Sequence, residues 1–163
     1  MEIYLLRHGE AQSSDAPGIH SDAERALTPN GKKELLKIIS GLKKVVDLPD
    51  LILTSPLCRA RETAEIVRSV FDLPQERIEE RSDLGAQPSP AAIIESARKT
   101  GKKRVFVVGH EPDLSHCVAW IAAARVGDGA VMKKGGIARI DIDEKKSGVI
   151  WLLPPKITKA LDK

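Results

Sequence analysis

The amino-acid sequence predicts an α/β fold built around a mostly parallel sheet. Three short apolar runs, at 3–6, 51–53 and 105–108, are each followed by a stretch with helical periodicity. This alternation is typical of parallel strands, because parallel neighbours need a crossover connection that usually contains a helix. Two later apolar segments, Ile137–Ile142 and Val149–Leu153, flank a short charged turn and predict a C-terminal hairpin that extends the sheet.

The composition is that of one globular domain, expected to span residues 1–163. A chain of this length with 42% hydrophobic residues can bury a substantial core. The aromatic content is 3% and the net charge is +3 from scattered basic pairs, so no nucleic-acid partner is expected. No apolar run is long enough for a membrane span and no signal peptide is visible, while the two cysteines are expected to be free thiols. We therefore expect a cytoplasmic protein, whose oligomeric state the sequence does not indicate.

The first half of the chain should contain two strand–helix units. After the strand at 3–6, the polar stretch Gly9–Leu27 is expected to be a long loop, of a length that is usually functional or mobile. Thr28 and Pro29 then begin a helix, as N-cap and first helical residue, which should end at Leu48-Pro49. After the strand at 51–53, Ser55 and Pro56 are expected to begin the next helix in the same way. The other expected elements are a weak strand around Ile78, a loop at 82–90, and helices at 90–99 and 112–124.

Side chains with useful chemistry follow the three predicted parallel strands, at the point where each strand ends. Arg7 and His8 come directly after the first strand. Arg59 lies in the first turn of the helix after the second strand, and His110 follows the third. Ligands bind at the carboxyl ends of parallel strands, so these side chains should surround one crevice. Arginine forks match phosphate oxygens and histidine can be a nucleophile, which predicts a phosphate site capable of covalent chemistry.

Each of these residues taken alone has a simpler explanation. A histidine at the end of a strand is more often structural than catalytic. Arg59 alone would be expected to pair on the helix surface with Glu62 or Glu65. The joint pattern favours the phosphate site, because three separate strand ends carry it.

Other chemistries can be tested against the spacing of their residues. A cysteine-dependent phosphatase needs an arginine six residues after the cysteine, but alanine stands at that distance from Cys58 and Cys117. A zinc-protease helix would need a histidine four residues after His110, where Leu114 stands instead, and the glycine-rich nucleotide-binding loops are absent. No carboxylates have obvious metal-ligand spacing, so neither a metal nor another cofactor is expected.

Four segments resemble the motifs of the histidine phosphatase superfamily, which has a phosphoglycerate-mutase-like fold. They are Leu6–Glu10, Arg25–Gly31, Ser55–Thr63 and Gly109–Pro112, in the order in which the family carries them. The short chain and the Glu-Pro pair after the second histidine are most similar to the SixA-type phosphohistidine phosphatases. Beyond about residue 137 the resemblance is to the architecture only.

The resemblance implies a three-layer α/β/α sandwich and a metal-free, two-step phosphoryl transfer. It implies that His8 attacks phosphorus and becomes a transient phosphohistidine, which water then hydrolyses. It also implies that Arg7, Arg59 and His110 hold the phosphate oxygens. Two arginines and a protonatable histidine can balance the ~1.5–2 negative charges of a phosphate group without a metal ion.

The roles of three further residues remain open at this stage. Asp83 is the best positional match for a general acid, but a solvated or helix-capping aspartate explains it equally well. Glu10 could orient His8 or line the entrance to the site. Arg25 could bind or gate the substrate, or have neither role. Ser55 is expected to cap its helix rather than to bind phosphate.

The leading functional hypothesis is a phosphatase for phosphohistidine in a phosphorelay or carrier protein. Its first alternative is a phosphatase for a small phosphomonoester metabolite. A second alternative is a non-catalytic phosphate-binding module, which would need the arginines but has no use for a nucleophile at position 8.

Overall fold

The computed structural model describes residues 1–85, 87–123, 130–143 and 146–162. One six-stranded sheet runs through it in the order β3-β2-β4-β1-β5-β6. The pairs β1–β4, β4–β2 and β2–β3 are parallel, while β5 is antiparallel to both β1 and β6. The strands are β1 (Glu2–Arg7), β2 (Leu51–Thr54), β3 (Ile78–Glu80), β4 (Arg104–Gly109), β5 (Ile137–Ile142) and β6 (Ser147–Leu153). The mostly parallel sheet and its C-terminal hairpin are therefore confirmed, although residues 144–145 of the turn lie outside the described residues.

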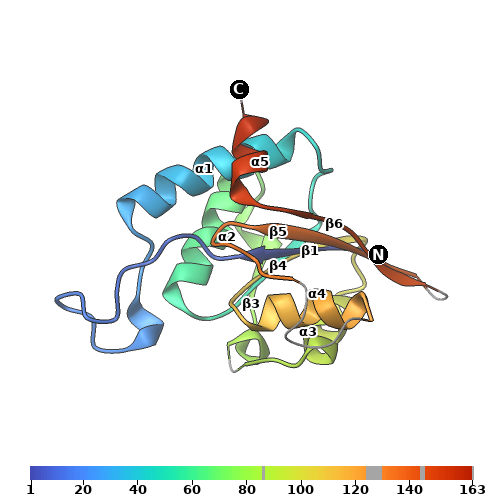
Figure 1. The fold of residues 1–163 in the computed structure, drawn as a ribbon, viewed down its shortest axis with the longest axis horizontal. Helices are drawn as coiled ribbons and strands as arrows, with labels where there is room; N and C mark the ends of the chain where they lie inside the picture. Colours follow the sequence, from blue (N-terminus) through green and yellow to red (C-terminus); the bar gives the residue numbers. More distant parts are fainter. Residues whose placement is uncertain (86, 124–129, 144–145, 163) are drawn as a thin grey trace.

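Helices cover both faces of the sheet and complete a three-layer α/β/α sandwich (Figure 1). On one face α1 and α2 pack against the sheet and α5 packs on α1, while α3 and α4 cover the other face. The helices are α1 (Pro29–Lys43), α2 (Cys58–Val70), α3 (Pro90–Arg98), α4 (Asp113–Ile121) and α5 (Pro155–Ala160). Within the described residues, no helix is both long and apolar enough to cross a membrane.

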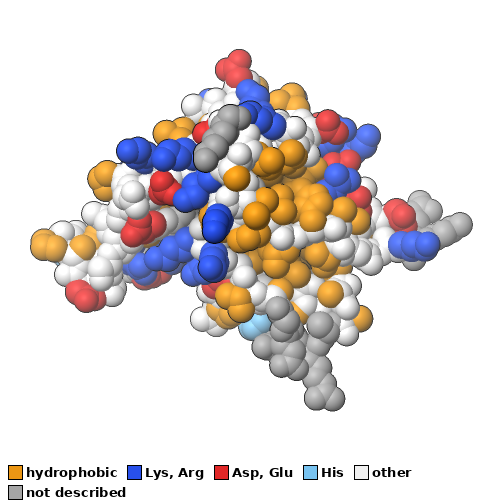
Figure 2. Space-filling model, turned by 45° about the horizontal axis from the view of Figure 1, so that its top comes forward, with side chains coloured by type: hydrophobic (Ala, Val, Ile, Leu, Met, Phe, Trp, Pro, Cys, Tyr) orange, Lys and Arg blue, Asp and Glu red, His pale blue; other side chains and the backbone are white. Residues whose placement is uncertain are grey.

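Burial on both faces explains why the parallel strands are continuous apolar runs. In β1, Tyr4 and Leu6 point into the core under α1 and α2, while Ile3 and Leu5 point into the core under α3 and α4. Tyr4 stacks on Phe106 of the neighbouring strand β4, with ring centroids 4.8 Å apart. On the surface shown in Figure 2, Lys and Arg side chains lie among Asp and Glu side chains rather than in one uninterrupted stripe.

The start of α1 is as predicted, but its end is not. The hydroxyl of Thr28 accepts a hydrogen bond from the backbone N–H of Gly31 at 2.9 Å, and Pro29 is the first helical residue. The helix stops at Lys43 rather than near Leu48. The N–H groups of Lys44 and Val45 bond to carbonyls three residues earlier, so the helix ends in tighter turns.

The predicted start of α2 is wrong by two residues. The helix begins at Cys58 with Leu57 as its N-cap, so Pro56 lies outside it. Ser55 is fully buried, and its hydroxyl accepts a weaker bond from the N–H of Leu57 at 3.3 Å while it contacts His110. The side chain of Ser55 thus belongs to the site described below more than to the helix.

Three differences concern the other predicted elements. The helix α4 ends at Ile121, and its predicted end at residue 124 lies outside the described residues. The predicted loop at 82–90 contains a 3₁₀ turn at Ser82–Leu84. The C-terminal helix α5 was not predicted, and it packs so closely on α1 that a side chain at Gly41 would clash with the backbone of Thr158.

The long polar segment between β1 and α1 closes on itself. Ala11 pairs with Leu27 in an isolated antiparallel bridge, and the N–H of Gln12 bonds to the carbonyl of Ala26 at 2.9 Å. The excursion carries a short 3₁₀ helix at Asp22–Glu24. We refer to residues 9–27 as the β1–α1 loop, which projects away from the sheet (Figure 1).

Candidate active site

The sheet order places the ends of β2, β4 and β1 side by side, as predicted. Arg7 is in register with Gly109, and the N–H of His8 bonds to the carbonyl of Gly109 at 3.1 Å. The rings of His8 and His110 are therefore neighbours, with centroids 5.1 Å apart. Besides burial, the charges of Arg7 and Arg59 lower the pKa of both histidines, so both guanidinium groups lie close enough to act on the two rings electrostatically. The structure thus brings together the four side chains that follow the strand ends.

His8 is held as a neutral imidazole with one free nitrogen. Its Nδ1 lies 2.7 Å from the carbonyl oxygen of Gly9, which can only accept, so Nδ1 carries the proton and Nε2 keeps its lone pair. Only 7% of the residue is exposed, and this burial lowers its pKa to about 3, against the effect of the Gly9 bond. The neighbouring positive groups act in the same direction as burial. A neutral His8 at physiological pH has the electronic form that a nucleophile requires.

His110 is held through Nε2, whereas His8 is held through Nδ1. Its Nε2 lies 2.8 Å from the hydroxyl oxygen of Ser55, whereas its buried Nδ1 has no hydrogen-bond partner among the residues that the structure describes. Burial lowers its pKa to about 4, with Arg59 and Arg7 acting in the same direction and Asp22 opposing them. The unpartnered Nδ1 is available to a ligand.

Arg7 also has one anchored and one unpartnered nitrogen. Its Nη1 donates to the carbonyl of Met132 at 2.6 Å, and its buried Nε has no partner in the described part of the chain. The N–H of Gly135, a residue with a φ of +73°, bonds to the carbonyls of Arg7 and His8 at 3.1 and 3.2 Å. The segment before β5, which contains Met132 and Gly135, is therefore hydrogen-bonded to the end of β1 on the side opposite β4.

A chain of hydrogen bonds links the segment that holds Arg7 to α4. The N–H of Met132 donates to the hydroxyl of Ser115 at 3.2 Å. That hydroxyl in turn donates to Oε2 of Glu111, whose buried Oε1 has no partner within the described residues. Ser115 thus positions the carbonyl group to which Arg7 is bound.

Arg59 is buried rather than paired on the surface of its helix. Only 7% of it is exposed, and its Nη1 and Nη2 donate to the backbone carbonyl and to Oδ2 of Asp22, both at 2.8 Å. The surface pairing with Glu62 or Glu65 is therefore wrong. Glu62 instead accepts from the N–H of Leu27 at 2.6 Å, and Glu65 pairs with Arg68.

Arg25 shares the same carboxylate with Arg59. Its Nη1 donates to Oδ1 of Asp22 at 2.7 Å, and its Nε donates to the carbonyl of Gln12 at 2.7 Å. Asp22 is not among the site residues that the sequence pattern predicts. The only signal was an acidic residue three positions before Arg25, and that spacing does not reveal the contact with Arg59, which depends on how the β1–α1 loop folds back.

Two further candidates lie in other surroundings. Asp83 has a side chain 47% exposed and pairs with Arg81 at 3.2 Å, which holds the pKa of its carboxyl below the usual range. A general acid needs a raised pKa instead. The exposed carboxylate of Glu10 accepts from Asn30 at 2.9 Å at the start of α1, so the Gly9 carbonyl, and not Glu10, orients His8.

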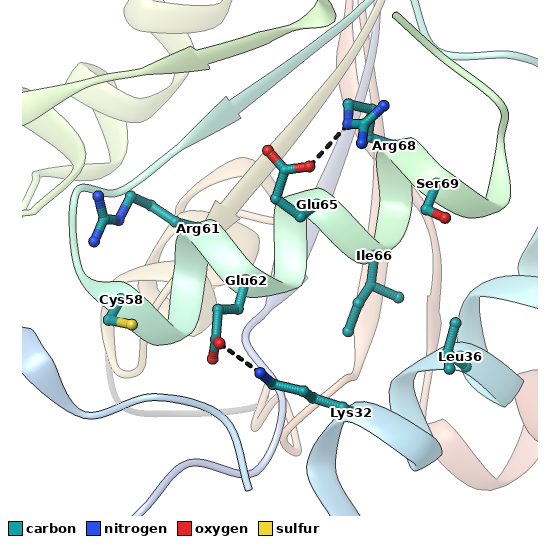
Figure 3. A pocket seen from close by; sticks show the side chains of 9 residues that line it. All are labelled: Lys32, Leu36, Cys58, Arg61, Glu62, Glu65, Ile66, Arg68 and Ser69. Carbon is teal, nitrogen blue, oxygen red and sulfur yellow. Dashed lines mark hydrogen bonds and ion pairs between the residues drawn. The ribbon is translucent and has the colours of Figure 1, made fainter. Parts of the chain in front are cut away.

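The largest cavity that we describe lies elsewhere, between α1 and α2, with a volume of about 640 Å³ (Figure 3). Figure 3 shows Lys32 facing Glu62 across it and Glu65 facing Arg68, so much of its lining charge is already paired. In the described part of the chain, no three His, Cys, Asp or Glu side chains are grouped so that they could hold a metal ion. The chemistry therefore collects at the strand ends and not in this cavity.

Comparisons with known proteins agree with the fold and identify the family. The family model of the histidine phosphatase superfamily (branch 1) matches residues 3–85. The chain is 28% identical over 167 residues to the phosphohistidine phosphatase SixA of Escherichia coli, covering 99% of this chain and 100% of that protein. It is similar to the structure of protein histidine phosphatase SixA complexed with tungstate, with a TM-score of 0.80, 26% identity and coverage of 96% and 99% of the two chains. The fold of the alpha-ribazole phosphatase from Shigella flexneri is also similar, with a TM-score of 0.72, 20% identity and coverage of 95% and 97%.

Proposed function

The chain belongs to the histidine phosphatase superfamily, and we propose that it removes the phosphoryl group from phosphorylated histidine in a phosphorelay or carrier protein. One observation carries the proposal. The free Nε2 of neutral His8 lies beside the ring of His110, and two buried donors at the same strand ends, the Nε of Arg7 and the Nδ1 of His110, have no partner among the described residues. A nucleophile beside unsatisfied donors is the arrangement that phosphoryl transfer requires. The similarity to SixA over the whole chain supports the choice of phosphohistidine as substrate.

The proposed reaction has two steps. In the first, the lone pair on Nε2 of His8 forms a bond to phosphorus, the P–N bond of the substrate breaks, and its electron pair goes to the leaving imidazole. In the second, water attacks the phosphorus of phospho-His8, the P–Nε2 bond breaks, and Nε2 recovers its lone pair. The proton that water loses goes to phosphate or to solvent.

The other site residues have supporting roles in this proposal. Arg7, Arg59 and His110 hold the phosphoryl oxygens, whose ~1.5–2 negative charges the two guanidinium groups offset. No general acid is needed, because a phosphoimidazole protonated on its second nitrogen leaves as a neutral ring. Asp83 and Glu10 are therefore dispensable, while Arg25 acts through Asp22.

Label transfer tests the proposal directly. A histidine-containing carrier protein phosphorylated with ³²P should lose its label to inorganic phosphate when mixed with the wild-type chain. Brief incubation should also trap an acid-labile, base-stable label on His8. His8→Ala should abolish both signals, whereas the control His20→Ala, at an exposed histidine of the β1–α1 loop, should preserve them. Turnover that survives His8→Ala would contradict the mechanism.

A small phosphomonoester is the second candidate substrate. The similarity in fold to alpha-ribazole phosphatase favours it, although at 20% identity that likeness concerns the fold alone. The same assay with sugar phosphates and nucleotides decides between the two, because our proposal requires a higher kcat/KM for the phosphorylated carrier. Phosphate binding without any turnover would instead indicate the non-catalytic module.

A further inference from the structure

A carboxylate lies inside the group of positive side chains that should bind phosphate. Asp22 accepts from Arg59 through both its backbone carbonyl and its Oδ2, and from Arg25 through its Oδ1. These bonds hold its pKa below the usual range, so Asp22 is ionised at physiological pH and cannot serve as a proton donor. The negative charge of Asp22 also acts to raise the pKa of His110, so Asp22 interacts electrostatically with the site. A fixed negative charge beside a phosphate site repels the phosphoryl group. A carboxylate at this position is therefore expected to make another interaction with the substrate that offsets this repulsion.

The bonding of Arg59 allows the carboxylate and a phosphoryl group to be bound together. A guanidinium has five N–H donors, and Asp22 takes only two of those of Arg59. The remaining donors can hold a phosphoryl oxygen, so Asp22 and the substrate would lie on one guanidinium. The Asp22 side chain is 59% exposed, and each of its oxygens has a lone pair left for an incoming donor. Asp22 is thus a fixed anionic acceptor at the rim of the phosphate site.

The two candidate substrate classes place different charges at this rim. A phosphoimidazole that is ready to leave carries a proton on its second ring nitrogen and hence a positive charge. The leaving oxygen of a phosphomonoester becomes negative as its bond to phosphorus breaks. An ionised carboxylate therefore stabilises the first and destabilises the second.

We propose that Asp22 is a specificity-determining residue that selects phosphoryl groups carried on imidazole by accepting the N–H of the leaving ring. This inference rests on the proposed function. During transfer, the lone pair of Nε2 of His8 forms the new bond to phosphorus, and the electron pair of the old P–N bond stays on the departing nitrogen. The proton bound to the second ring nitrogen remains there, facing Asp22, and the ring leaves as neutral imidazole.

Asp22→Asn tests the inference, because it removes the charge and keeps one side-chain oxygen for Arg59, whose bond to the backbone carbonyl of residue 22 is unchanged. The variant should lower kcat/KM for a phosphohistidine peptide by about tenfold, the difference between a charge-assisted and a neutral hydrogen bond. It should raise kcat/KM for p-nitrophenyl phosphate, whose leaving group is an anion. The control is Glu24→Gln, in the same 3₁₀ helix, where the carboxylate accepts only from the N–H of His20 at 3.0 Å. That control should change neither value.

The opposite direction of the two changes separates this inference from its competitors. If Asp22→Asn misfolds or no longer positions Arg59, both activities fall. If the carboxylate of Asp22 only repels phosphate from the site, Asp22→Asn raises both activities. Either result would overturn the inference while wild-type turnover of phosphohistidine still supports the proposed function. A wild-type chain that cleaves p-nitrophenyl phosphate and leaves phosphohistidine intact would instead overturn the proposed function, and the inference with it.

Discussion

The hydroxyl oxygen of Ser55 lies 2.8 Å from Nε2 of His110, and both residues are buried. The hydroxyl accepts from the N–H of Leu57 and has a hydrogen of its own that it can donate to Nε2. This arrangement favours the proton of neutral His110 on Nδ1, the nitrogen that has no partner. Ser55 thus turns His110 into a donor aimed at the phosphate site.

Ser55→Ala should therefore damage activity more than stability. Nε2 of His110 would lose its partner and the ring its fixed tautomer, which should lower kcat/KM by about tenfold or more, since an unsatisfied buried group costs ~1–3 kcal/mol. Nitrogen NMR shifts of His110 would report the loss of the Nδ1–H form. Ser89→Ala is the matched control, because Ser89 caps α3 through the N–H of Ala92 at 3.2 Å. It should lower the melting temperature and leave kcat/KM unchanged, and equal kinetic effects in the two variants would contradict this role for Ser55.

The two buried histidines predict a loss of stability in acid. The pKa of His8 is lowered to about 3 and that of His110 to about 4, while the unfolded value is ~6.5. Between these values the unfolded chain binds more protons than the folded chain, so the free energy of unfolding falls as the pH falls. Each imidazole should contribute a slope of roughly 1.4 kcal/mol per pH unit, present from about pH 6 downward and absent above pH 7.

Urea denaturation at half-unit steps from pH 4.5 to 7.5 measures this slope. Carboxylates with lowered pKa values, such as Asp22, destabilise in acid as well, so the comparison must be made with variants. His8→Gln should remove about one imidazole's share of the slope below pH 6 and leave the curve above pH 7 parallel to that of the wild type. Identical slopes in the two proteins would show that His8 is not held neutral by burial.

The convergence of the four strand-end residues could be predicted from the sequence, because each strand and its end are recognisable from the local pattern of apolar residues. A strand buried on both faces is a continuous apolar run, so its end is visible, and the parallel arrangement of strands then fixes where His8 and His110 lie. The partners of these residues could not be predicted in this way. Ser55-Pro56 and Thr28-Pro29 have the same cap-like pattern, yet only Thr28 caps its helix.

The remaining differences arise from contacts between segments far apart in the sequence. Asp22 reaches Arg59 only because the β1–α1 loop folds back on itself, and loops carry no periodic signal. The short α5 is polar and would be marginal alone, but the close approach at Gly41 lets it pack on α1. Tertiary packing decides such elements, and a pattern along one segment does not contain that information.

The position of the Arg7 side chain depends on Ser115 through Met132, which lies between them. Ser115 holds the N–H of Met132, and the carbonyl of Met132 holds Arg7. Ser115→Ala should free this segment and raise KM severalfold while kcat falls less, because the loss concerns how tightly the phosphoryl group is held. The control is Cys117→Ala, on the same helix but facing α3, where its Sγ approaches the carbonyl of Pro90. It should lower stability only, and a Ser115→Ala variant with wild-type KM would refute the positioning role.

Asp83 offers a test of whether the reaction needs a general acid. Its carboxylate is exposed, paired with Arg81 and ionised at physiological pH, so it has no proton to give. With phosphohistidine as substrate, Asp83→Asn should therefore keep kcat/KM within about twofold of the wild type, as expected for an exposed substitution. The pH profile should also keep its shape, because no titrating acid has been removed.

A general acid at this position would behave differently in two respects. Asp83→Asn would lose the alkaline-side limb of the pH profile, and the loss of activity would be larger for p-nitrophenyl phosphate analogues with poorer leaving groups. Arg81→Gln separates the two cases further, since it releases Asp83 from its ion pair and lets the pKa of the carboxyl rise toward its ordinary value. An acid would gain activity at low pH from that change. A dispensable Asp83 predicts no gain, because the imidazole leaving group already carries the proton that it needs.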